Sequence, residues 1–145
     1  MKLNGGLYDD MVEKKSVMCM QCALARTGLV YGNLSFLVLW SEYKILDGLT
    51  AGAVQYLYND DIDFNYELMP ESTNPLLLCP SKERALVECI KCEKWCDEGV
   101  LIEAMKNYLW AFKDMDKLYE VADHFKVPRS KIDYWVKEAE EDEDL

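Results

Sequence analysis

The chain has 145 residues, half of them hydrophobic, and a formal net charge of −11 at pH 7. This length and apolar content suffice for one core, so we expect a single domain over residues 1–137. No apolar run reaches the roughly 20 residues of a membrane helix, and the polar start does not resemble a secretory signal, which favours a cytoplasmic protein. The negative charge also makes free nucleic acid a poor partner.

Short apolar segments separated by turn residues fill the N-terminal half. Apolar residues at helical spacing predict a helix over Ser16–Thr27, which Gly28 closes in a left-handed conformation. Asn33–Trp40 is rich in β-forming residues and predicts a buried strand, whereas Ala51–Tyr58 fits either a strand or a short helix. Two further strands are expected at Phe64–Met69 and Leu76–Cys79.

The chain beyond Pro80 carries a helical pattern. Ser81 suits an N-cap, and Pro128 suits a first helical turn because its missing amide has no partner to lose there. Strands followed by helices predict an α+β fold, in which a small, mostly antiparallel sheet in the N-terminal half is packed by helices and the C-terminal half is helical. The four expected helices span Ser81–Cys96, Glu98–Phe112, Met115–Phe125 and Pro128–Glu140.

The negative charge gathers in two blocks, each with six acids and no base. The first runs from residue 45 to 81, and the second is the tail at 138–145, which we expect to be disordered. The rest of the chain carries a net charge of +1, so the negative charge is confined to these blocks. Such blocks favour a basic protein partner; the alternative is that they only keep the protein in solution. The candidate partner-binding acids are Asp60, Asp61, Asp63 and Glu67.

The cysteines raise the possibility of a zinc site. Cys19 with Cys22, and Cys89 with Cys92, have the spacing of zinc-ligand pairs. Both pairs fall inside predicted helices, however, and Cys89, Cys92 and Cys96 share one apolar helical face. Because a free cysteine packs as a small hydrophobic residue, we predict core thiols, with no metal, no thioredoxin-like pair and no cofactor.

Enzyme signatures are missing from the sequence. His124 is the sole histidine, so a metal site with two histidines cannot form, and no phosphate-binding loop, dinucleotide fingerprint or nucleophile elbow occurs. The acids near residue 60 lack the glycine and the terminal glutamate of a calcium loop. We therefore expect a non-enzymatic protein in which His124 is half-buried or lies at the surface.

The segment Leu118–Lys137 has the pattern of a helix-turn-helix. Arg129, Ser130 and Lys131 begin its second helix and are candidate nucleic-acid contacts. Lys126 stands where the turn usually has glycine, and the acids that follow the motif would repel phosphates within about 8 to 10 Å. A packed helix pair without a nucleic-acid role is the alternative. The expected packing residues are Ala122, Val127, Ile132 and Trp135.

Three segments resemble motifs in the C-terminal domain of the AbiEi family, the antitoxins of type IV toxin–antitoxin systems. They are CALARTGL at 22–29, CPSKERALVECI at 79–90 and KLYEVADHFKV at 117–127. They follow the order of the family motifs and extend over most of residues 16–137. Members of the family usually carry an N-terminal winged helix, and because only about fifteen residues precede the similar region, we expect that domain to be missing.

The resemblance implies a non-enzymatic antitoxin that suppresses a nucleotidyltransferase-type toxin. Within its strand-to-helix motif, Glu83 and Arg84 are expected to fix the junction or to face the protein partner. The alternative is a phage or mobile-element inhibitor of a nucleic-acid-binding defence complex, similar to an anti-CRISPR protein, whose acids imitate phosphates. A small helix-turn-helix transcription regulator is a second alternative.

Overall fold

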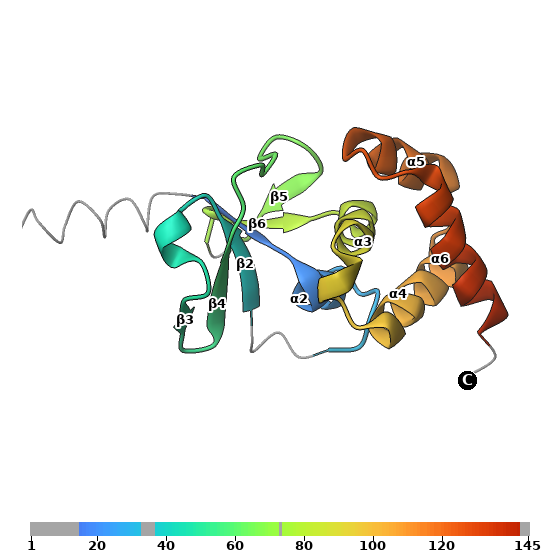
Figure 1. Ribbon diagram of the computed structural model, residues 1–145, viewed down its shortest axis with the longest axis horizontal. Helices are drawn as coiled ribbons and strands as arrows, with labels where there is room; N and C mark the ends of the chain where they lie inside the picture. Colours follow the sequence, from blue (N-terminus) through green and yellow to red (C-terminus); the bar gives the residue numbers. More distant parts are fainter. Residues whose placement is uncertain (1–14, 33–36, 73, 143–145) are drawn as a thin grey trace, which may run out of the picture.

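The computed structural model describes residues 15–32, 37–72 and 74–142 and has an α+β fold (Figure 1). Strands and one helix fill the first half, and helices fill the second. In chain order the elements are β1 (Ser16–Met18), α2 (Met20–Arg26), β2 (Leu37–Ser41), the 3₁₀ turn η1 (Lys44–Leu46), β3 (Thr50–Ala51), β4 (Val54–Tyr58), β5 (Leu68–Pro70), β6 (Leu77–Pro80), α3 (Lys82–Lys91), the 3₁₀ turn η2 (Glu93–Trp95), α4 (Glu98–Ala111), α5 (Met115–His124) and α6 (Arg129–Glu141).

The strands form one mixed sheet in the order β3-β4-β2-β1-β6-β5. Strand β1 lies inside it, antiparallel to β2 and parallel to β6. The longest pairing, between β2 and β4, is also parallel, whereas β3 and β5 pair antiparallel with their neighbours. The expectation of a mostly antiparallel sheet misses these parallel pairs, because alternation along a strand does not state the direction of its neighbour.

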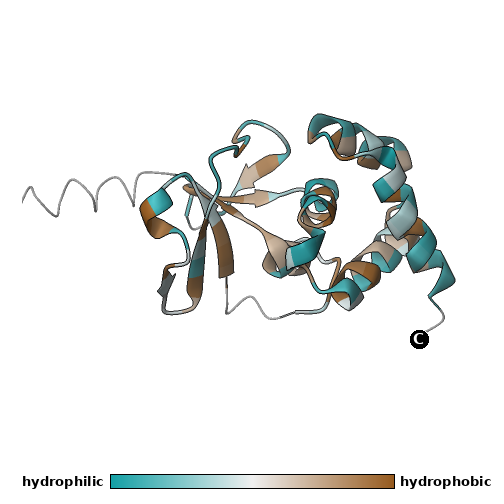
Figure 2. Ribbon diagram, viewed as in Figure 1, coloured by the Kyte–Doolittle hydropathy of each residue, from teal (hydrophilic) through white to brown (hydrophobic). Residues whose placement is uncertain are grey.

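The helices α2 and α3 lie between the sheet and the group formed by α4, α5 and α6 (Figure 1). The main core joins all five helices to one face of the sheet, and a smaller cluster around Val17 and Trp40 fills the other face. Figure 2 shows the same division, with brown strands and inner helix faces and teal on the outer faces of α5 and α6. Within the described ranges, no helix has both the length and the apolarity needed to cross a membrane.

The first predicted helix is wrong at its start. Ser16–Met18 is a strand, and α2 begins only at Met20. This segment is hydrogen-bonded between β2 and β6, and these sheet pairings outweigh the helical spacing of a few apolar residues. The predicted end of the helix is confirmed, because Gly28 follows it with a φ of +80°.

The remaining strand predictions are confirmed in part. The ambiguous segment 51–58 is extended in β3 and β4, which a turn at Gly52 joins. The strand expected at 64–69 is wrong before Leu68, since the preceding residues form turns. Strand β6 confirms the last prediction, and β2 confirms the strand at 33–40 from Leu37, while residues 33–36 lie outside the described residues.

The helical half matches its predicted order, with two corrections. Helix α3 ends at Lys91, and η2 replaces its predicted last turn. The expected disorder of the tail is wrong for residues 138–141, which belong to α6. Ala139 is buried there, and Asp142 forms an ion pair of 3.1 Å with Lys106, so tertiary contacts hold the helix past the predicted boundary. Residues 143–145 lie outside the described part of the tail.

Candidate interaction site at the strand-to-helix junction

The junction between β6 and α3 follows the geometry that its sequence predicts. The hydroxyl of Ser81 accepts a hydrogen bond of 3.2 Å from the amide of Arg84, which confirms Ser81 as the N-cap. Ala85 and Leu86 point inward and are buried. The junction thus joins an inner region of the sheet to the helix that contacts every other long helix.

Arg84 occupies the centre of this junction and is completely buried. Its Nη1 donates hydrogen bonds to the backbone carbonyls of Asp63, at 2.8 Å, and Tyr66. Its Nε lies 3.2 Å from a carboxylate oxygen of Glu88, and its guanidinium lies 4.9 Å from the ring centre of Phe125. One side chain therefore ties α3 to the loop before β5 and to the end of α5.

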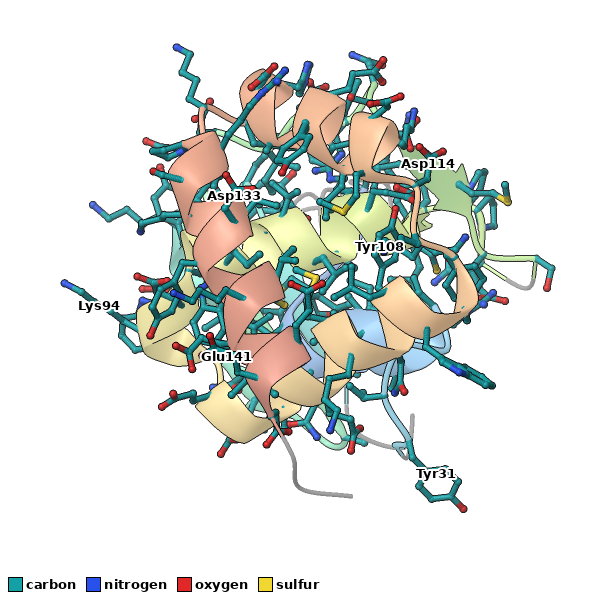
Figure 3. All side chains as sticks on the ribbon, turned by 90° about the vertical axis from the view of Figure 1, so that its right-hand side faces the viewer. Tyr31, Lys94, Tyr108, Asp114, Asp133 and Glu141 are labelled. Atoms are coloured by element: carbon teal, nitrogen blue, oxygen red, sulfur yellow. The ribbon has the colours of Figure 1, made fainter. Side chains whose placement is uncertain are left out.

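The two glutamates beside Arg84 are also buried, and each has a partner. Burial raises the pKa of Glu88 to about 7, although the adjacent Arg84 opposes this shift. Glu83 accepts a hydrogen bond of 2.9 Å from the hydroxyl of Tyr108. Figure 3 shows Tyr108 reaching from α4 toward the segment that carries Asp114, whose backbone carbonyl lies 2.9 Å from the same hydroxyl.

These contacts distinguish between the two roles expected for Glu83 and Arg84. Burial leaves Arg84 no surface for a partner, and Glu83 is only 8% exposed. Both side chains fix the junction, which is the first of the two expected roles, and a contact of either with a partner stays a prediction. The sequence could not show this burial, since most of their partners lie in distant segments.

Two of the four candidate acids, Asp63 and Glu67, are engaged inside the molecule. Asp63 lies 2.7 Å from the Nε2 of His124, and Glu67 forms an ion pair of 3.0 Å with Lys117. The amide of Asn65 and then His124 lower the pKa of Asp63. Partial burial would raise the pKa of Glu67, but hydrogen bonds from Lys117 and Ser81 outweigh it and lower that pKa. Both acids therefore fasten the β4–β5 segment to α5.

The other two acids, Asp60 and Asp61, are exposed in the turn that follows β4. The structure therefore divides the candidate set into two internal contacts and two surface charges. His124, expected to be half-buried or at the surface, is the last residue of α5 and stacks on Tyr66 with ring centres 3.6 Å apart. This stacking adds a third contact between the β4–β5 segment and α5.

The helix-turn-helix segment packs as its pattern predicts. Its four packing residues are buried, and Lys126 adopts the left-handed conformation usual for the turn glycine, with a φ of +58°. The candidate nucleic-acid contacts are exposed, but Arg129 forms a two-pronged ion pair with Asp123, at 3.1 and 2.6 Å. Lys131 lies 3.2 Å from Glu93, so both cations already face a carboxylate. Ser130 carries no charge.

Sequence reasoning missed a set of large exposed aromatic residues. Trp95, at the end of η2, and Trp110, in the last turn of α4, are 82% and 89% exposed. A signal was available for Trp110, because it lies two residues after buried Tyr108 and therefore on the opposite helix face. Phe112, half-exposed at the same end, lies under the ammonium group of Lys82 at 4.5 Å.

All six cysteines lie in the described residues and are free thiols. The predicted stripe is correct for buried Cys89 and wrong beyond it, since Cys92 and Cys96 follow the end of α3 and are half-buried. No group of three or more cysteine, histidine or acidic side chains in the described ranges has an arrangement that could hold a metal ion.

Comparison of the sequence with protein-family models finds no match, and comparison with curated proteins finds none either. A functional proposal for this chain therefore depends on its motif segments and on the contacts that these segments make in the fold.

Proposed function

We propose that the chain is an antitoxin-like, non-enzymatic protein that suppresses a nucleotidyltransferase-type toxin. The observation that carries this proposal is the packing of the three segments that resemble AbiEi motifs. Helix α3, from the strand-to-helix motif, packs against both α2 and α5, which contain the other two (Figure 1). Motifs scattered along a chain are expected to meet in this way when they define one domain.

The exposed end of α4 supports a role in protein binding. Trp110 and Phe112 lie there, and Phe112 contacts Lys82 in the first turn of α3. Tryptophan dominates the energetics of many protein interfaces, because it buries a large apolar area with little loss of side-chain entropy. We therefore assign the partner contact to Trp110 and Phe112, beside the strand-to-helix motif.

The charge arrangement favours this proposal over phosphate mimicry. A mimic needs free carboxylates along one surface, whereas Asp63 and Glu67 are engaged with His124 and Lys117. A transcription regulator would need free cations at the start of α6, where Arg129 and Lys131 both face carboxylates. Phosphate mimicry and nucleic-acid binding therefore each lack some of the free charged side chains that they require.

The proposal is tested by co-expressing the chain with a nucleotidyltransferase toxin of a type IV system and measuring bacterial growth. Wild type is expected to restore growth. Trp110→Ala should lose most of this rescue, as for a contact worth about 2 kcal/mol, or roughly a 30-fold change in affinity. Trp95→Ala changes a tryptophan of similar exposure in η2, before the start of α4, and this matched control should retain rescue.

The two failures have different meanings. If wild type does not restore growth although it accumulates in folded form, the antitoxin proposal is wrong. If wild type restores growth and both tryptophan variants do so equally well, the toxin is the target but the end of α4 is not the contact.

A further inference from the structure

A groove lies between the end of α2, strand β5 and the start of α3. Its volume is about 390 Å³, and its wall contains Arg26, Met69, Pro70 and Lys82, which define what we call the α3 groove. Lys82 also contacts the exposed end of α4, because its ammonium group lies 4.5 Å from the ring centre of Phe112. The α3 groove therefore adjoins the surface to which we assign the partner contact.

Part of the groove wall is apolar and open to solvent. Met69 is 71% exposed, and its neighbour Pro70 is exposed as well. Both belong to β5, which is the last strand at its edge of the sheet. Proline has no amide hydrogen to offer to a further strand, so this edge is poorly suited to strand addition. A partner segment in the groove is therefore expected to bind mainly through its side chains.

The charges of the groove leave one cation without a carboxylate. Arg26 forms an ion pair of 3.3 Å with Glu71, and Glu67, which also lines the groove, forms one of 3.0 Å with Lys117. Lys82 has no carboxylate partner within the described part of the chain, where its charged group faces an aromatic ring instead. The α3 groove thus presents a positive charge on a protein whose net charge is −11.

The surroundings of Lys82 favour an ion pair with a binding partner. The residue is half-buried, and the ring of Phe112 holds its ammonium group through a cation–π contact. Because its position is already restricted, little side-chain freedom is lost when a carboxylate binds. Apolar neighbours such as Met69 lower the local dielectric constant, so a pair formed here is stronger than one in open solvent.

We propose that the α3 groove binds an acidic segment of a partner protein, in which a carboxylate pairs with Lys82 and an adjacent aliphatic side chain covers Met69 and Pro70. The inference rests on the proposed function, because the same partner covers Trp110 and Phe112. Charge complementarity selects this occupant, since a basic segment is repelled by Lys82, and a nucleic acid is repelled by the net charge of the chain. The groove adds one ion pair to the apolar contact.

The first test measures growth rescue by charge variants in cells that express the nucleotidyltransferase toxin. Lys82→Glu should lose most of the rescue, whereas Lys82→Arg should keep it. An acid at the first position of α3 suits the helix dipole, so Lys82→Glu is expected to fold. Lys94→Glu, which reverses the charge of an exposed lysine in η2 outside the groove, is the matched control and should keep rescue. Equal rescue by wild type and Lys82→Glu would refute the groove inference and leave the antitoxin proposal intact.

The second test needs no toxin and therefore separates the groove inference from the proposed function. Its probes are two capped tripeptides, leucine–glutamate–leucine and leucine–glutamine–leucine, which are titrated at millimolar concentration into the isotope-labelled full chain and followed by NMR. The glutamate peptide should shift the amide signals of Met69, Lys82 and Phe112 and should bind about threefold more tightly than the glutamine peptide.

The preference for glutamate should disappear in Lys82→Gln and weaken at high salt. This result would support the groove inference even if the wild-type chain failed to suppress the toxin. Equal affinities of the two peptides for the wild-type chain, or shifts confined to other parts of the protein, would overturn it.

Discussion

Arg84 is a charged residue that is buried in the core, and the polar groups around it compensate for its lost hydration. Its Nη1 donates to carbonyls that lie 18 and 21 residues upstream, and Glu88 lies beside it one turn later on α3. The Ser81 cap was predictable because it depends on three adjacent residues. The burial of Arg84 was not, since it requires the β4–β5 loop to fold over α3.

Removing Arg84 should destabilise the fold strongly. Arg84→Ala leaves Glu88 and two backbone carbonyls buried without their cation, so we expect a loss of about 3 to 5 kcal/mol in the free energy of unfolding. Urea unfolding followed by circular dichroism measures this loss. Lys82→Ala, which removes a less buried cation in the same turn, should cost less than about 1 kcal/mol. Equal losses in the two variants would refute the structural role of Arg84.

Glu88 should give the protein a distinct pH dependence. Its folded-state pKa of about 7 lies above the ordinary value near 4.5, so the folded state binds its proton more tightly than the unfolded state. The free energy of unfolding should therefore fall as the pH rises from about 4.5 to 7, by about 2 to 3 kcal/mol in total.

The control for this pH dependence is a comparison of two glutamine variants. Glu88→Gln should remove the decline, and Glu103→Gln, at an exposed position of α4, should keep it. Urea unfolding at a series of pH values tests both. A decline that persists in Glu88→Gln would assign the effect to another group.

At the scale of elements, local signals located the helix ends well and the sheet poorly. Ser81 predicted the N-cap of α3 and Gly28 predicted the end of α2, because these signals act within one turn. Strand β1 was missed because three residues carry no reliable period, and its place between β2 and β6 is decided by non-local pairing. In the turn between α5 and α6, Lys126 occupies the left-handed position where glycine is usual.

Lys126 is strained in the turn that closes α5. Its φ of +58° is left-handed, and the amide of Val127 donates to the carbonyl of Ala122 at 2.8 Å, which is the arrangement that glycine usually closes. Lys126→Gly should therefore stabilise the protein by about 0.5 to 1 kcal/mol. Lys137→Gly, within helical α6, is the matched control and should destabilise it by about 1 kcal/mol. Thermal unfolding that ranks the two variants in the opposite order would contradict this interpretation.

The last turn of α6 should contribute to stability. A chain that ends at Lys137 loses buried Ala139 and the ion pair of Asp142 with Lys106, so we expect a loss of about 1 to 2 kcal/mol. A chain that ends at Asp142 keeps both contacts and should unfold like the full chain. Denaturant midpoints compare the three lengths, and an unchanged midpoint after removal of residues 138–145 would show that the turn contributes nothing.

At the scale of the molecule, the chain is strongly acidic, and its core is built around α3, which contacts the other four helices and β6. The net charge follows from composition, and the α+β class was predicted from strand-like segments that precede helical ones. Both properties depend on many residues, so an error at a few positions does not change them. The exposed aromatic end of α4 and the division of the acids between internal pairs and surface were not predictable, since both follow from the packing of distant segments. Our proposal uses both features, since it assigns the partner contact to apolar side chains rather than to charge.

The most direct measurement of this account is the growth of cells that express a type IV nucleotidyltransferase toxin together with the wild-type chain or its Asp60→Asn, Asp61→Asn double variant. Both substitutions lie on the surface and leave the internal pairs of Asp63 and Glu67 intact. We predict that both chains restore growth equally. Failure of the folded wild-type chain to restore growth would contradict the antitoxin proposal, and loss of rescue in the double variant alone would show that charge, and not apolar contact, recognises the partner.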